Sequence, residues 1–112
     1  MSGPYARVQE LVEMARAAVS RGERESGGAL YREAAWMEWA HVVGLPAGRP
    51  RTVALFGVDA LEHFALAGDV GMVRTVAAAL ILQEDLKPYS HRMVCDLLLA
   101  AVEGRAGGAD VA

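Results

Sequence analysis

The fold of this chain is decided by residues 50–84, which read PRTVALFGVDALEHFALAGDVGMVRTVAAALILQE. Apolar residues recur here at spacings of three and four, which is typical of the buried stripe of an α-helix. Gly68-Asp69 interrupts the pattern, because glycine supplies a turn and aspartate caps the helix that follows. The stretch therefore predicts two helices, about Pro50–Ala67 and Asp69–Glu84, folded back on each other as a hairpin.

Helical patterning extends over the rest of the chain, which helix breakers divide into segments of similar length. Further helices are expected at about Pro4–Arg21, at Ser26–Val43 with Ser26 as N-cap, and from Pro88 or Ser90 to Glu103. The breaks fall at Gly22, Gly27-Gly28, Gly44–Pro50 and Lys87-Pro88. No segment combines β-branched alternation with hairpin turn residues. The sequence therefore predicts an all-α fold of about five helices, arranged as antiparallel helical hairpins.

The length and composition indicate a single small domain. The chain has 112 residues, of which 54% are hydrophobic but only 6% aromatic, so small aliphatic residues must fill the core. This apolar content excludes a disordered segment, and a core of small residues suits closely packed helices. We expect one domain over residues 1–104 and a flexible Gly/Ala tail at 105–112.

Charge and cysteine usage exclude several classes of protein. The net charge of −3 offers no basic excess to neutralise a phosphate backbone, so no nucleic-acid partner is expected. Cys95 is the single cysteine, which excludes an internal disulfide and a cysteine-based zinc site. The longest apolar run, Val76–Leu82, is too short to span a bilayer, and Met1–Glu10 lacks the apolar stretch of a signal peptide. We expect a cytoplasmic protein without cofactor or membrane partner.

Two helix–turn–helix units can be aligned on their turn glycines, Gly22 and Gly68. Four positions of the first unit match a repeat pattern: a small residue (Ala15), the turn glycine (Gly22), an aromatic residue (Tyr31) and an alanine (Ala34). Three positions of the second unit match the same pattern: an aromatic residue (Phe64), the turn glycine (Gly68) and an acidic residue (Asp69). At these positions the chain resembles the tetratricopeptide (TPR)-like helical repeats. The pattern has alanine at two positions where this chain has Val73 and Gly27. The alternative fold is a non-repetitive five-helix bundle. The resemblance implies a scaffold that presents a groove to a protein or peptide.

The outer face of the helix at Pro50–Ala67 is the main candidate for contact with a partner. Its apolar members are Leu55, Val58 and Leu66, and its polar border is formed by Asp59 and Glu62. An exposed apolar patch with a polar rim is typical of a protein interface, and a homodimer is one way to cover it. Arg49 and Arg51, beside the start of this helix, are candidates for holding an acidic group. The alternative is that the first or the fifth predicted helix covers the face.

Other functions are considered on different residues. A small-molecule-binding or enzymatic helical bundle would use Trp36, Trp39 and His41, and a structural homo-oligomer subunit is a third possibility. Glu38 and His41 form a single Glu-x-x-His, whereas a di-iron bundle needs two, and His63 and His91 are interpreted as unrelated histidines at helix edges. We therefore predict no catalytic residue and no metal ligand, and a non-enzymatic protein–protein interaction module, acting as scaffold, adaptor or regulator, as the function.

Overall fold

The computed structural model describes residues 4–45, 50–83 and 86–104. These residues form five helices and no strand: α1 (Pro4–Ser20), α2 (Arg24–Val43), α3 (Pro50–Leu66), α4 (Val70–Ile81) and α5 (Pro88–Val102). The predicted all-α fold of about five helices is confirmed. The expected tail at 105–112 lies outside the described residues. No helix within the described ranges combines the length and the apolar content that crossing a bilayer requires.

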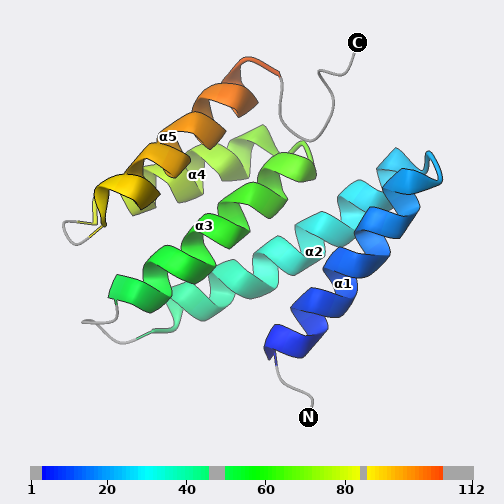
Figure 1. Ribbon diagram of the computed structural model, residues 1–112, viewed down its shortest axis with the longest axis horizontal. Coiled ribbons are helices and arrows are strands. Elements are labelled where there is room, and N and C mark those ends of the chain that lie inside the picture. Colours follow the sequence, from blue (N-terminus) through cyan, green and yellow to red (C-terminus); the bar gives the residue numbers. More distant parts are fainter. Residues whose placement is uncertain (1–3, 46–49, 84–85, 105–112) are drawn as a thin grey trace.

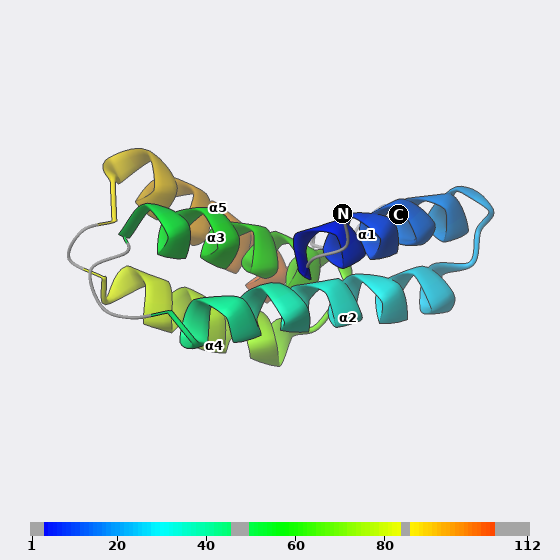
Figure 2. The same cartoon turned by 90° about the horizontal axis from the view of Figure 1, so that it is seen from below.

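The helices lie in two layers that alternate along the chain. Figure 2 shows α1, α3 and α5 in one layer and α2 and α4 in the other. Each helix packs on the next, and α3 also packs on α5. Consecutive helices run antiparallel (Figure 1), as the short connections predict. α2 is thus placed beneath both α1 and α3, which decides where the site described below is formed.

Two glycines make the turns at which the hairpins reverse. Gly22 ends the first helix with φ +82°, and Gly68 ends the third with φ +75°. These left-handed conformations favour glycine because it has no Cβ atom to clash with the backbone. Asp69 then caps α4, since its side chain accepts a hydrogen bond of 3.2 Å from the backbone nitrogen of Met72. The predicted turns and the predicted cap at Asp69 are confirmed.

The start of α2 differs from the prediction. The helix already includes Ser26 and is preceded by Glu23 in the cap position, so the assignment of Ser26 as N-cap is wrong. Gly27 does not break the chain but is buried inside α2. A Cβ atom at Gly27 would lie 2.6 Å from Cγ2 of Val19 and 3.2 Å from the carbonyl oxygen of Ala15. The glycine is therefore needed for the close approach of α1 and α2.

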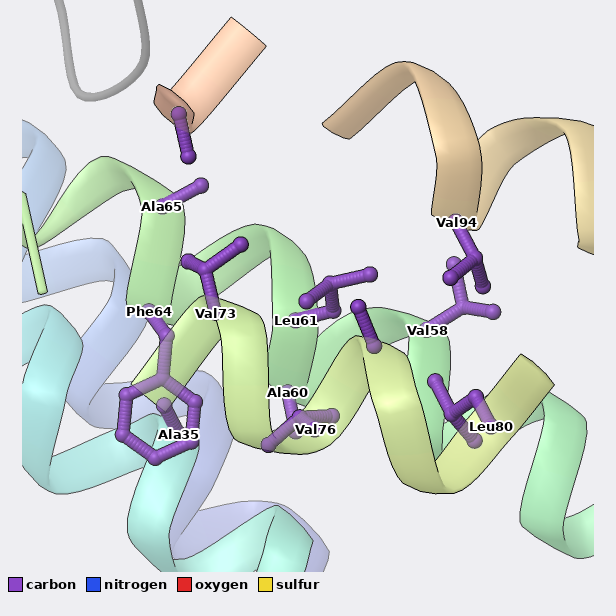
Figure 3. Close-up of a cluster of buried hydrophobic side chains, with 12 residues drawn as sticks. Ala35, Val58, Ala60, Leu61, Phe64, Ala65, Val73, Val76, Leu80 and Val94 are labelled. Carbon is purple, nitrogen blue, oxygen red and sulfur yellow. The ribbon is translucent and has the colours of Figure 1, made fainter. Parts of the chain in front are cut away.

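Two apolar clusters hold the helices together. The larger one joins α3, α4 and α5 with Ala35 of α2, and its fully buried members include Leu61, Phe64, Val73 and Leu80 (Figure 3). The smaller one joins α1 and α2 around Leu11 and other buried residues of these two helices. Small side chains fill much of both clusters, as the composition predicts. Because α3 takes part in the larger cluster and α1 in the smaller, the space between α1 and α3 lies at the boundary of the two.

Candidate functional site

Two charged residues are buried at the boundary between the two apolar clusters. Glu38 of α2 is 2% exposed and His63 of α3 is 9% exposed, and they are the buried polar residues of the described part of the chain. Nδ1 of His63 donates a hydrogen bond of 2.5 Å to Oε1 of Glu38. The ring of Tyr31 is stacked on the imidazole, with 5.9 Å between the ring centroids. Burying a charged group is costly unless it is paired, so each member of the pair stabilises the other in the interior.

The surroundings shift the proton equilibria of the pair. Burial raises the pKa of Glu38, and the hydrogen bond from His63 opposes this rise without cancelling it. Burial acts to lower the pKa of His63, but the hydrogen bond and the charge of Glu38, with smaller effects from Glu62 and Asp59, outweigh burial and raise it. The pair therefore retains a proton to higher pH than an isolated histidine does.

The pair lies at the base of a pocket between α1 and α3. The pocket has a volume of about 240 Å³ and is bordered by side chains of three helices. α1 supplies one wall, α3 the other, and Glu38 of α2 the floor, since α2 lies in the layer beneath (Figure 2). The lining residues are Tyr5, Val8, Gln9, Val12, Glu13 and Arg16 from α1, Glu38 from α2, and Asp59, Glu62 and His63 from α3.

The pocket is acidic. Four carboxylates line it, from Glu13, Glu38, Asp59 and Glu62, against the single guanidinium of Arg16. Asp59 and Glu62 make no hydrogen bond or ion pair with any other described residue. Burial raises the pKa of Asp59, because its charged form has lost part of its hydration, and the charge of His63 opposes this rise without cancelling it. The site can therefore stabilise a positive charge and disfavours an anion.

The predicted contact face of α3 is divided by the structure. Leu55 and Leu66 are exposed, at 60% and 36%, whereas Val58 is only 8% exposed. Figure 3 places Val58 in the core near Leu80 and Val94, so its assignment to an exposed contact face is wrong. At this position α4 and α5 supply the side chains around Val58, whereas the alternative expected cover from the first or the fifth helix.

The remaining four residues of that face form one line along α3. Leu55, Asp59, Glu62 and Leu66 follow one another at intervals of four, three and four residues, which places them on the same side of the helix. The two acids lie in the middle of the line and border the pocket, and the two leucines lie beyond them at either end. Arg49 is outside the described residues, as is the side chain of Arg51 at the start of α3.

Trp36, Trp39 and His41 do not form a common site. Trp36 is half-exposed and meets the ring of Phe64 edge-on at 5.5 Å, and Trp39 packs against the larger apolar cluster. His41 is exposed and lies against the ring of Phe56 at 4.7 Å. None of the three lines the pocket between α1 and α3 or the groove between α4 and α5, so neither site is the ligand box that the sequence suggested. The described residues contain no group of three potential metal ligands.

Sequence reasoning missed the pairing of Glu38 with His63. The interpretation of His63 as an unrelated histidine at a helix edge is wrong, because its ring is buried against another helix. A signal was present in the sequence: Ala34, Glu38 and Val42 recur at intervals of four, so Glu38 occupies a position in a buried stripe. A carboxylate in such a stripe requires a partner. Spacing within α2 points to His41, whereas the real partner comes from α3.

A second surface feature lies on α4 and α5. An apolar groove of about 510 Å³ runs between α4 and α5. It is lined by Arg74, Ala78, Ile81, Leu82, Leu98 and Val102. Leu82 is 79% exposed, and Ile81 and Val102 are exposed in part.

Comparison of the chain with models of known protein families, with curated proteins and with solved structures gave no match. Its function is therefore argued from the geometry and chemistry of the site itself.

Proposed function

We propose that the chain is a non-enzymatic, TPR-like interaction module that holds a segment of a partner protein in the groove between α1 and α3. The observation that carries this proposal is the pocket between the two helices, to which three helices contribute side chains. A pocket formed by rigid helices is already in place before a ligand arrives, so little conformational entropy is lost on binding.

The shape of the site favours an extended segment over an isolated small molecule. Leu55 and Leu66 lie on α3 beyond the two ends of the acidic line, and both are exposed. A chain passing along α3 would rest apolar side chains on these leucines and place a polar side chain in the pocket between them. Exposed aliphatic residues around a polar centre are suited to recognising alternate side chains of a peptide.

The lining of the pocket is suited to holding a polar group of a partner, because its carboxylates can accept hydrogen bonds. In the TPR-like interpretation, the hairpins stack with α1, α3 and α5 in one layer and α2 and α4 in the other (Figure 2), and the stack forms a groove for a partner.

The proposal is tested by selecting binders from a library of random peptides displayed on phage. Selected peptides are then added to ¹⁵N-labelled protein, and the shifted amide signals are mapped onto the helices. We expect shifts at residues that line the α1–α3 pocket, such as Glu13, Asp59 and His63. Failure to enrich any peptide, or shifts confined to the α4–α5 groove, would overturn the proposal.

Two further predictions accompany this function. The first is a cytoplasmic location, which is checked by fractionation of the source cell. The second is a homodimer, which is measured by size-exclusion chromatography with light scattering across a range of protein concentrations. A strict monomer at the highest concentration would exclude the homodimer without affecting the proposed peptide groove.

A further inference from the structure

We propose that the pocket between α1 and α3 receives a basic side chain, a lysine ammonium or an arginine guanidinium, from the partner segment. This inference rests on the proposed function, because it names the chemistry of the group held in the same groove. The basic side chain would contact three carboxylates that line the pocket, those of Asp59, Glu62 and Glu38.

The carboxylate of the buried residue Glu38 has one oxygen atom that makes no hydrogen bond within the described structure. Oε1 of Glu38 accepts the hydrogen bond from His63, whereas Oε2 makes none with any described residue. No fully buried side-chain oxygen or nitrogen of the described residues lacks a hydrogen-bond partner. Oε2 must therefore reach the open space of the pocket, although Glu38 as a whole is only 2% exposed. A carboxylate oxygen held at the base of a pocket is an acceptor that awaits a donor.

The charge of the pocket stays negative in either protonation state of His63. With a neutral imidazole, the four carboxylates face only Arg16. With a protonated imidazole, His63 cancels Glu38, and Glu13, Asp59 and Glu62 still outnumber the one guanidinium. Arg16 makes no ion pair with any of them in the described structure, so it leaves these carboxylates free.

Apolar side chains of α1 lie beside the acidic residues in the lining of the pocket. Val8 and Val12 of α1 line the pocket together with Tyr5. Lysine and arginine carry their charge at the end of an aliphatic stem, which packs along apolar side chains while the charged head meets the carboxylates. Charge-assisted hydrogen bonds to Asp59 and Glu62 are stronger than neutral ones, particularly where water is partly excluded. The pocket therefore offers apolar side chains for the aliphatic stem and carboxylates for the charged head.

The test compares capped peptides that differ in one central side chain. The probes are Ac-Gly-Lys-Gly-NH₂ and Ac-Gly-Arg-Gly-NH₂, with norleucine and citrulline in place of lysine and arginine as uncharged controls. Binding is followed by the amide shifts of ¹⁵N-labelled protein at low salt. We expect the charged peptides to shift the signals of the pocket and the uncharged peptides to bind at least about tenfold more weakly. Equal binding of charged and uncharged peptides would overturn the inference.

A pair of variants assigns the effect to the named carboxylates. Asp59→Asn with Glu62→Gln removes two charges from the pocket and keeps the size of both side chains. Glu25→Gln with Glu33→Gln removes two charges from the exposed surface of α2 and serves as the matched control. We expect the first variant to weaken the lysine peptide about tenfold and the second to leave it unchanged. Circular dichroism establishes that both variants are folded. Unchanged binding by the folded pocket variant would also overturn the inference.

The outcome for the basic side chain is distinguishable from that for the peptide groove. Selected peptides that occupy the α1–α3 groove but carry no lysine or arginine would preserve the proposed function and remove this inference. The opposite outcome is that the short lysine peptide binds in the pocket but the phage library yields no binding peptide. That result would preserve the preference for a basic side chain and remove the proposed function.

Discussion

Nδ1 of His63 lies 2.5 Å from Oε1 of Glu38, so an imidazole on α3 and a carboxylate on α2 satisfy each other inside the protein. The two residues are separated by 25 positions in the sequence. Their contact links the floor of the pocket to one of its walls, and its stability, its charge and its position all bear on what the pocket can bind.

The first prediction concerns the stability that depends on this pair. Replacing His63 by leucine leaves the Glu38 carboxylate buried without its partner, and we expect the free energy of unfolding to fall by about 3 kcal/mol. Replacing both residues by leucine removes the uncompensated group, so the double variant should lose less than the sum of the two single variants. Urea denaturation of the four proteins measures this coupling. Additive losses would show that the two side chains do not interact.

The second prediction concerns the dependence of stability on pH. The pKa of His63 is raised in the folded protein, so the folded state holds its proton more tightly than the unfolded state does. The stabilisation from this proton is complete below pH 6.5 and is lost as the pH rises through the raised pKa. The melting temperature should therefore fall between mildly acidic and alkaline pH. In His63→Gln this part of the slope should disappear, and an unchanged slope in that variant would contradict the assignment.

The third prediction concerns the approach of α1 and α2. Alanine at position 27 would gain helix propensity but would bring its Cβ to 3.2 Å from the carbonyl oxygen of Ala15. The side chain of Val19 can rotate away, whereas the backbone of α1 must shift. We expect Gly27→Ala to lower the free energy of unfolding by about 1–2 kcal/mol. Gly71→Ala is the control, because its Cβ would meet Asp69 only at an ordinary 3.8 Å. Stabilisation by both substitutions would show that α1 and α2 are not in tight contact.

The fourth prediction concerns the exposed leucines of α3. Leu55→Asp with Leu66→Asp should leave the helical circular dichroism intact, because both side chains are exposed and neither belongs to a buried apolar cluster. We expect the double variant to lose binding of the selected peptides, since charge would replace apolar contact at both ends of the groove. Leu82→Asp, on the α4–α5 groove, is the matched control and should bind normally. Unfolding of the double variant would mean that Leu55 and Leu66 belong to the core.

Local features of the fold were predictable from the sequence, because they depend on neighbouring residues. Gly22, Gly68 and Asp69 mark turns and a cap whose chemistry lies within a few positions of each. Ser26 misled for the same reason: it is a good capping residue, but the chain already resumes the helix after the turn at Gly22. Helix type and order follow from periodicity, whereas the first residue of a helix depends on how the preceding turn is closed.

The candidate site was predictable only in part. Asp59 and Glu62 were identified as a polar border on the outer face of α3, and they do line the pocket. Val58 was assigned to the same face, although α4 and α5 cover it. Spacing shows which residues share a side of one helix but not which helix lies opposite. The contact between Glu38 and His63 depends on the packing of α2 against α3, which no short-range pattern contains.

The separation of the core into two apolar clusters has a consequence for cooperativity. α1 is attached to the rest of the fold mainly through the smaller cluster that it shares with α2, while α3 belongs to the larger one. A helix anchored on one neighbour is expected to open more readily than a central one, and its amide protons exchange sooner. A ligand held between α1 and α3 would bridge the two clusters and slow this local opening. Occupancy of the groove would then be visible as amide protection at α1, far along the chain from the residues of α3 that hold the charge.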